Sequence, residues 1–314
     1  MNNQYNNVVI LHDWLTGYRG GERVLEAICE QYPNAPIYTL IHKPGSTSKF
    51  LESRQIHTSF LNLIPGIHKH YRKFLPLMPI AVFFMKIKEK NCDLMISSSH
   101  CVIKGVKKPT GARHVCYIHT PMRYIYDQFD AYFPKGSFIR VIAKLVRPYL
   151  VWWDKKSNKN VDLFVPNSAF VEKRIKMFYG DKIQTHIVKP FVDLKDFEQF
   201  KSVPPQKENF YLMVTAFAPN KRVDLAIKAF NELKLPLKII GSGSCEEVAR
   251  LKSLAGSTIE FLGNLSRQEV IDHYAKAKAF IFPGVEDFGI TPIEANASGT
   301  PLIAFKAGGV LETQ

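Results

Sequence analysis

A chain of 314 residues is longer than one hydrophobic core usually supports, so its length favours two domains of ordinary size. Hydrophobic residues make up 46% of the sequence, charged residues make up 22%, and no long low-complexity tract interrupts it, which excludes a disordered protein. The net charge of +14 requires an anionic partner, and nucleic acid, an anionic membrane and a phosphorylated ligand would each satisfy it. The sequence contains no recognisable nucleic-acid-binding motif, so we expect no nucleic-acid partner.

The cysteines and the N-terminus indicate the compartment. The cysteines are odd in number and irregularly spaced, a pattern typical of a reduced, cytosolic protein. The opening segment MNNQYNNVVILHDW lacks the basic region, long apolar run and small-residue cleavage site of a secretory signal. No uninterrupted apolar stretch reaches the roughly 18 residues that a membrane-spanning helix needs. We therefore expect a cytoplasmic protein that contacts a membrane without crossing it.

Short apolar runs, each followed by a turn signal and a helical pattern, recur along the chain. In the first half they are Val8 to His12 and the runs that begin at Asp93, His114 and Asp162. This alternation predicts a doubly wound α/β domain with a parallel sheet. The pattern restarts in the runs that begin at Phe210, Leu237, Ile259, Ala279 and Pro301, which predicts a second α/β domain.

The segment between the two halves is charged, has few periodic apolar positions and contains Pro204-Pro205, as expected of a surface connection. We place the boundary after residue 189, which predicts domains at 1–189 and 190–314. Ligands of open α/β sheets bind beyond the carboxyl ends of the strands. Two such domains facing each other would form one central cleft, with the functional residues on strand-to-helix loops.

A paired-glycine turn lies early in the chain. In HDWLTGYRGGERVLEAICE, Gly20 and Gly21 stand between a predicted strand and a helix with apolar residues at helical spacing. Adjacent glycines allow close backbone approach and positive φ angles, as a phosphate-binding loop needs. A plain tight turn is the alternative, since a lone Gly-Gly pair is a weak indication.

Two segments mix basic residues with large apolar side chains. The first, 58–88, contains Lys69, Arg72 and Lys73, and the second, from Ser137, contains Arg140, Lys144 and Arg147. Basic amphipathic segments can lie in the interface of an anionic membrane. The alternative is that the apolar residues are core and the basic residues extend from its rim. We favour the membrane interpretation.

The segment FPGVEDFGITPIEANASG contains two acids, Glu286 and Glu294, eight positions apart. The helix predicted here would offer its first backbone N–H groups, around Phe288, Gly289 and Ile290, to a phosphate or another anion. Helical geometry would separate the two acids by about 12 Å, which exceeds the roughly 5 to 9.5 Å between the paired carboxyl groups of glycosidases. The spacing therefore favours contacts with two ends of one ligand over hydrolysis.

A structural role for Glu294 is the alternative. Thr291 would cap the helix, Pro292 would occupy its first position, and Glu294 would be the acid of a capping box. Under this interpretation Glu294 stabilises the helix start and need not contact a ligand.

This segment resembles the E-x7-E motif of glycosyltransferase family 4, whose members are retaining enzymes with the GT-B fold. Other stretches are similar in the same order: HDWL, SSSHCVIKGVKKP, HVCYIHTPMRYIYD, PNSAFV and KRVDLAIKAF. Together they resemble the subgroup that includes bacterial O-antigen and lipid-linked-oligosaccharide mannosyltransferases. The resemblance implies that Glu286 contacts the transferred sugar and that Glu294 contacts the ribose of the donor.

The resemblance also implies roles for residues outside this motif. The Gly20-Gly21 loop would face the donor diphosphate, and His119 would face the reacting sugar, although a structural histidine at a strand end is the alternative. Lys221, with Arg222, would neutralise the diphosphate, unless the two are only a solvated charge pair. Many relatives carry an arginine where this chain has Ala216, so Arg222 would have to replace that contact.

We therefore expect a retaining glycosyltransferase that moves a hexose, with mannose from GDP-mannose favoured, to a lipid-linked or lipopolysaccharide-type acceptor. We expect no cofactor and no metal, because no Asp-x-Asp motif is present, and a location on the inner face of the cytoplasmic membrane. The alternatives are a UDP-sugar-dependent hexosyltransferase and a non-catalytic peripheral membrane protein. Relatives continue for several helices beyond the position of Gln314, so the resemblance also implies an incomplete C-terminal domain.

Overall fold

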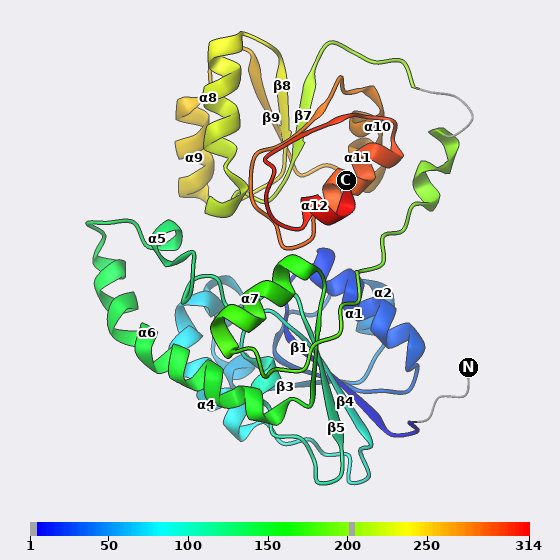
Figure 1. Ribbon diagram of the computed structural model, residues 1–314, viewed down its shortest axis with the longest axis vertical. Coiled ribbons are helices and arrows are strands. Elements are labelled where there is room, and N and C mark those ends of the chain that lie inside the picture. Colours follow the sequence, from blue (N-terminus) through cyan, green and yellow to red (C-terminus); the bar gives the residue numbers. More distant parts are fainter. Residues whose placement is uncertain (1–4, 201–204) are drawn as a thin grey trace. The chain divides into compact units, whose positions relative to one another are not determined.

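The computed structural model describes residues 5–200 and 205–314, which form two compact units, one ending at Phe191 and the other beginning at Val192. Each unit is a parallel sheet with helices on both faces (Figure 1). The boundary predicted from the sequence lies two residues before this division. No helix within the described residues is both long and apolar enough to cross a bilayer.

The first unit contains a six-stranded sheet in the order β3-β2-β1-β4-β5-β6. The strands are β1 (Val8–Leu15), β2 (Ile37–His42), β3 (Ile56–Thr58), β4 (Leu94–Ser99), β5 (Arg113–Ile118) and β6 (Leu163–Pro166). The chain moves outward from β1 to β3 and then returns to place β4 on the other side of β1. The sheet therefore has its topological switch point between β1 and β4, where open α/β sheets bind ligands.

Helices cover both faces of this sheet. Alternate β1 residues belong to different cores: Ile10 packs with α1 (Gly20–Gln31) and α2 (Lys49–Glu52), whereas Leu11 packs with α4 (Met78–Phe84) and α6 (Phe138–Ser157). Further along the second face, α7 (Ala169–Tyr179) packs on β5 and β6. The short helices α3 (Ile67–His70) and α5 (Phe129–Tyr132) lie in connections. Burial on both faces explains why these strands read as continuous apolar runs.

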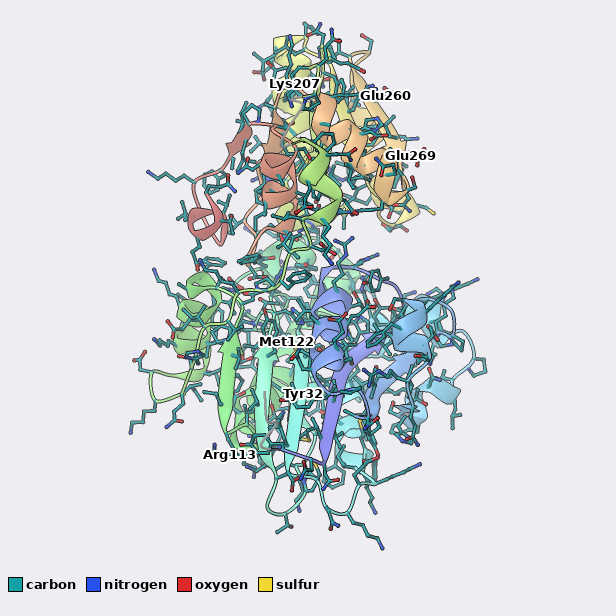
Figure 2. The ribbon with its side chains drawn as sticks, turned by 90° about the vertical axis from the view of Figure 1, so that its right-hand side faces the viewer. Tyr32, Arg113, Met122, Lys207, Glu260 and Glu269 are labelled. Carbon is teal, nitrogen blue, oxygen red and sulfur yellow. The ribbon has the colours of Figure 1, made fainter. Side chains whose placement is uncertain are left out.

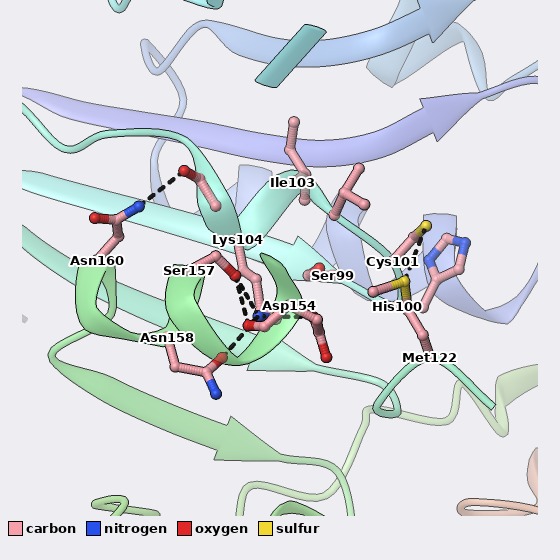
Figure 3. A network of polar contacts seen from close by, with 12 residues as sticks. Ser99, His100, Cys101, Ile103, Lys104, Met122, Asp154, Ser157, Asn158 and Asn160 are labelled. Atoms are coloured by element: carbon pink, nitrogen blue, oxygen red, sulfur yellow. Dashed lines mark hydrogen bonds and ion pairs between the residues drawn. The ribbon is translucent and has the colours of Figure 1, made fainter. Parts of the chain in front are cut away.

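A buried polar network fastens the end of α6 to the turn after β4 (Figure 3). The Lys104 ammonium, only 1% exposed, lies 2.9 Å from Oδ1 of Asp154 and donates to the Ser157 hydroxyl and the Asn158 amide oxygen, each at 2.7 Å. The Tyr126 hydroxyl donates to the other Asp154 oxygen at 2.8 Å. Burial of two charges is tolerated here because each is paired and hydrogen-bonded.

The second unit contains a five-stranded sheet in the order β11-β10-β7-β8-β9. Its strands are β7 (Tyr211–Val214), β8 (Leu237–Ile240), β9 (Ile259–Gly263), β10 (Phe280–Phe282) and β11 (Leu302–Ala304). One face carries α8 (Val223–Leu233) and α9 (Cys245–Leu254), and the other carries α10 (Arg267–Lys276), α11 (Ile290–Ala297) and α12 (Val310–Thr313). Its switch point lies between β7 and β10.

Candidate functional site

The first unit gathers polar side chains at the carboxyl ends of β1, β4 and β5. Strand β1 continues three residues beyond the predicted run, so Asp13 lies within it and is fully buried. Its carboxylate accepts four backbone N–H bonds of 2.7 to 2.9 Å, from residues 100–103 after β4. Asp13 thereby fixes that turn and places His100, whose Nδ1 lies 3.4 Å from the carboxylate. We did not identify Asp13 from the sequence, although an acid directly after a buried strand is a usable signal.

Two histidines meet on one serine at the switch point. The Ser98 hydroxyl lies 3.1 Å from Nδ1 of His12 and 2.8 Å from Nε2 of His119. Burial disfavours the charged imidazole, and the nearby His100 and His12 add to this effect, so the pKa of His119 falls to about 3. His119, which we predicted as a site residue, is therefore a neutral, half-buried imidazole at the carboxyl end of β5.

The paired glycines lie beside these rings. Helix α1 begins at Gly20, and neither glycine adopts a positive φ, so the left-handed conformation that we considered is not what the turn requires. A Cβ atom on Gly21 would lie 3.9 Å from Cε1 and Nε2 of His119 and 4.0 Å from Cε1 of His12. Glycine therefore keeps a side chain away from the Cε1–Nε2 edge of the His119 ring.

In the second unit, Glu286 lies at the carboxyl end of β10 beside the loop that follows β7. Its Oε1 forms an ion pair with the Lys221 ammonium and accepts a bond of 3.2 Å from the Asn220 amide. The structure thus brings together two residues that we predicted separately, Lys221 and Glu286, and adds Asn220. Both strands flank the switch point of this sheet.

Tight backbone packing holds this loop. A Cβ atom on Gly284 would lie 2.3 Å from the carbonyl oxygen of Asn220, and one on Gly308 would lie 2.6 Å from that of Glu286. Gly309 donates its N–H to the carbonyl oxygen of Glu286 at 2.8 Å. Only glycine permits these approaches, so these glycines position the Glu286 backbone.

The start of α11 differs from our prediction. The helix begins at Ile290, and its N-cap is Gly289 with φ +94°, so Thr291 is not the capping residue and Pro292 is not at the first position. The side chain of Phe288 is buried, so a ligand here would meet the backbone N–H groups of 288–290. Gly289 can serve as the N-cap in place of Thr291 because glycine adopts the left-handed conformation without strain.

Glu294 lies within α11 and is not a capping-box acid, which corrects that alternative. Its Oε1 accepts a bond of 2.6 Å from the Arg267 guanidinium, and its Oε2 accepts a bond of 3.3 Å from the Tyr274 hydroxyl. The carboxylate is 6% exposed. Arg267 begins α10, so the pair connects two helices on one face of the sheet.

The predicted partner of Lys221 lies elsewhere. The Arg222 guanidinium is half exposed and lies 3.2 to 3.3 Å from the Asp224 carboxylate, not against Glu286. Arg222 also adopts a positive φ of 51°, which is uncommon for a residue with a side chain. The structure therefore does not bring Arg222 to the Lys221–Glu286 pair.

The basic residues of the first unit divide into two groups. Arg140 pairs with Asp130 and the carbonyl oxygen of Phe133, and Arg147 donates to the carbonyl oxygen of Ile125 at 2.7 Å. These two arginines brace the α5 segment. The predicted surface cations Lys69, Arg72, Lys73 and Lys144 are exposed.

The outer side of α6 is apolar, which the core alternative did not anticipate. Phe138 is 79% exposed, Leu145 is 76% exposed and Trp152 is 56% exposed, and their spacing places them on one side of the helix. The opposite side buries Leu150 and Asp154. A second group of exposed apolar side chains lies on and near α4: Phe60, Leu63, Leu77, Ile80, Phe83 and Phe84.

Within residues 5–200 and 205–314, no group of three or more His, Cys, Asp and Glu side chains is arranged to hold a metal ion.

Residues 195–313 match the family described as "Glycosyl transferases group 1". The chain is 30% identical over 183 residues to a GDP-mannose-dependent monoacylated alpha-(1-6)-phosphatidylinositol monomannoside mannosyltransferase of Corynebacterium glutamicum, covering 51% of this chain and 48% of the relative. It is 29% identical over 187 residues to the O-antigen chain mannosyltransferase RfbU of Salmonella typhimurium, covering 57% and 50%. It thus spans about half the length of these curated relatives.

The fold is similar to that of sucrose-phosphate synthase from Thermosynechococcus elongatus, with a TM-score of 0.69 at 17% identity. The match covers 97% of this chain and 82% of that structure.

Proposed function

We propose that this chain, whose residues 195–313 match the glycosyl transferases group 1 family and whose fold is similar to that of a GT-B enzyme, transfers a hexose from a nucleotide diphosphate sugar to a lipid-linked acceptor. The observation that carries the proposal is the Lys221–Glu286–Asn220 cluster at the switch point of the second unit. The cluster combines a cation for a diphosphate with a fixed carboxylate for a sugar.

The diphosphate would lie between Lys221 and the first turn of α11. The N-terminal backbone N–H groups of a helix attract anionic oxygens, and an ammonium neutralises the charge that grows on the leaving diphosphate. The Lys221 side chain is 23% exposed, so it can reach a ligand without crossing the core. We propose that this arrangement replaces a metal ion, so excess EDTA should leave transfer unchanged.

Glu286 would bind the transferred sugar. Its carboxylate is already oriented by Lys221 and Asn220, and a carboxylate is an acceptor for the hydroxyl groups of a hexose. When Lys221 turns to the diphosphate, Glu286 exchanges an ion pair for sugar hydroxyl bonds. We propose that the anomeric configuration is retained and that a donor phosphate oxygen takes the acceptor proton.

Glu294 would bind the ribose only after a rearrangement. Its two oxygens are already bonded to Arg267 and Tyr274. We keep the ribose contact as a proposal that requires the Arg267 bond to open or to be shared with the ligand.

GDP-mannose is the favoured donor because the Corynebacterium relative is named as GDP-mannose-dependent and both curated relatives are named as mannosyltransferases. A UDP-sugar is the alternative. The same two names, a phosphatidylinositol mannoside and an O-antigen chain, support a glycolipid-type acceptor.

We propose that the outer side of α6 docks on the anionic inner face of the cytoplasmic membrane. Exposed Phe138, Leu145 and Trp152 can enter the interface, while Lys144 and Lys156 near them can contact lipid phosphates. The buried Lys104–Asp154 pair holds α6 in this orientation. Helix α4 covers the same face of the sheet as α6 through its buried residues, and its exposed apolar group would enlarge the docking surface.

The central experiment measures both donor binding and transfer. The chain is incubated with radiolabelled GDP-mannose, UDP-glucose or UDP-N-acetylglucosamine and bacterial lipid extract, and label in the lipid fraction is counted. We expect GDP-mannose to give transfer and to raise the melting temperature, since a ligand at 100 times its Kd stabilises by about 2.7 kcal/mol. If no donor raises the melting temperature or transfers label, the chain is a non-catalytic scaffold and the proposal is wrong.

Glu286→Gln tests the cluster itself. Removing a hydrogen bond to a charged group costs about 1.5 to 3 kcal/mol, so we expect transfer to fall about 10- to 150-fold with little loss of stability. Glu260→Gln is the matched control, because Glu260 is an exposed acid on β9 in the same unit (Figure 2). Equal transfer by the two variants would contradict the assignment of Glu286.

A further inference from the structure

The two histidines that share Ser98 cannot have the same hydrogen-bonding role. A serine hydroxyl has one proton, so it donates to one imidazole nitrogen and must accept from the other. The contacts are 3.1 Å to Nδ1 of His12 and 2.8 Å to Nε2 of His119. If Nδ1 of His12 accepts, Nε2 of His119 must carry a proton, and the reverse also holds.

Glu22 decides between the two arrangements. Its carboxylate lies 3.8 Å from Nε2 of His12, a fully buried nitrogen for which the described structure provides no hydrogen-bond partner. A carboxylate attracts an N–H and repels a lone pair, so the proton of a neutral His12 belongs on Nε2. The other Glu22 oxygen accepts the backbone N–H of Arg19 at 2.9 Å, which holds the carboxylate against the start of α1.

Glu22 remains ionised in this setting. Burial alone would raise the pKa of its carboxyl group, but the His12 N–H that faces it and the backbone N–H groups at the start of α1 outweigh burial and lower this pKa. The negative charge that orients His12 is therefore present at neutral pH.

We propose that Glu22 sets the tautomer of His119 through His12 and Ser98, so that Nδ1 of His119 presents a lone pair at the carboxyl end of the sheet. In this chain His12 donates from Nε2 toward Glu22, Ser98 donates to Nδ1 of His12, and His119 donates from Nε2 to Ser98. Glu22, His12 and Ser98 are positioning residues, because they act through His119.

The surroundings of His119 support a fixed acceptor. Its backbone N–H donates to the carbonyl oxygen of Ser99 at 2.8 Å, and its carbonyl oxygen accepts from the Asn167 amide at 3.2 Å. Among the described residues, none is seen to bond Nδ1 of His119.

The consequence is a selection among ligand groups. A nitrogen lone pair accepts a bond from a hydroxyl group but repels a phosphate oxygen, which is also an acceptor. A histidine at this position could contact either a sugar hydroxyl or a phosphate oxygen of the donor. With a lone pair on Nδ1, His119 would contact the sugar hydroxyl and not the diphosphate. This consequence rests on the proposed function, whereas the tautomer does not.

The test is 15N NMR of the whole chain with labelled histidine and no ligand. We expect His119 to show a protonated Nε2 and the strongly downfield Nδ1 resonance of a nitrogen without a proton. In Glu22→Gln the charge that orients His12 is lost, and we expect the population of this His119 tautomer to fall. Glu30→Gln, an exposed acid on the same helix, should leave it unchanged.

Two outcomes would overturn the proposal: a protonated Nδ1 on His119 in the wild-type chain, or an unchanged tautomer in Glu22→Gln. Ser98→Ala provides a second check. In a chain without this hydroxyl, adding Glu22→Gln should no longer change the tautomer population of His119. GDP-mannose and GDP are then added separately, and only the sugar nucleotide should shift Nδ1 of His119. A failure of both to bind would contradict the proposed function and leave the tautomer result standing.

Discussion

Gly21→Ala separates stability from function at the first unit's site. The new methyl group would meet its nearest atoms, on the rings of His119 and His12, at 3.9 to 4.0 Å, which is ordinary van der Waals contact. Gly21 is the second residue of α1 and does not need a positive φ. Replacing such a glycine by alanine typically stabilises a protein by about 0.4 to 1 kcal/mol, because the unfolded chain loses conformational freedom.

For a unit of this size, that free energy raises the melting temperature by about 1 to 4 °C. The same methyl group would lie against the Cε1–Nε2 edge of His119 and crowd a ligand bound at this ring, so we expect kcat/KM for transfer to fall at least tenfold, a loss of about 1.4 kcal/mol. Differential scanning calorimetry and the lipid-transfer assay measure the two effects on one preparation. A more stable enzyme with lower activity is the expected combination.

Gly17→Ala is the matched control. A Cβ atom on Gly17 would meet nothing within 4 Å, and the residue precedes the helix, so its replacement should leave transfer unchanged. Wild-type kcat/KM in Gly21→Ala would refute the idea that a ligand binds the His119 ring beside Gly21. A lower melting temperature would refute the packing argument.

Three further predictions concern the rest of the structure. Lys104→Met leaves the Asp154 carboxylate buried without its cation and should lower the free energy of unfolding by about 3 to 5 kcal/mol, measured by urea denaturation. The folded-state pKa of Glu22 is depressed from 4.5 to about 2, so ionised Glu22 contributes roughly 3 kcal/mol to the free energy of unfolding above about pH 4.5. This contribution is lost as the pH falls toward 2, and Glu22→Gln should make the free energy of unfolding fall less steeply in that range. Leu145→Glu should weaken sedimentation with vesicles that contain phosphatidylglycerol, whereas Leu233→Glu, an equally drastic change at an exposed leucine of α8, should not.

Each of these predictions has an outcome that contradicts it. Unchanged stability in Lys104→Met would show that the buried pair contributes nothing beyond its own desolvation. If the free energy of unfolding of Glu22→Gln falls as steeply between about pH 4.5 and 2 as that of the wild-type chain, another group titrates there. Equal vesicle binding by the two leucine variants would show that α6 is not the docking element.

The sequence predicted the central strands of both sheets well, because strands buried on both faces are continuous apolar runs. The runs from Asp93, His114 and Phe210 correspond to β4, β5 and β7. The interior strand β2, although its residues are almost all buried, and the edge strand β3 were not among the predicted runs. The start of α11 was predicted wrongly because Thr291 and Pro292 form a plausible cap, and only the backbone conformation of Gly289 shows that the helix starts earlier.

The residue types of the site were largely readable from the sequence, but their grouping was not. Glu286 and Lys221 were predicted as separate contacts, and they meet because β7 and β10 are neighbours across the switch point. His12 lies opposite Ser98 in the register of β1 and β4, although 86 positions separate them in the chain. No local pattern reveals such a contact, because strand order alone brings the residues together.

Helix α6 also shows what the sequence reveals and what depends on the tertiary structure. Its apolar periodicity was visible in the sequence, since a repeat of side chains along a helix depends only on local geometry. Which side of the helix faces water depends on its tertiary partners: Leu150 and Asp154, the latter paired with Lys104, are buried against the unit, and Phe138 and Leu145 are left exposed. By itself the sequence determined most of the strands, the place of the Gly20-Gly21 turn and the two acids Glu286 and Glu294, because these are local features. The tertiary structure decided which residues meet and which surface remains open, because those contacts join segments far apart in the chain.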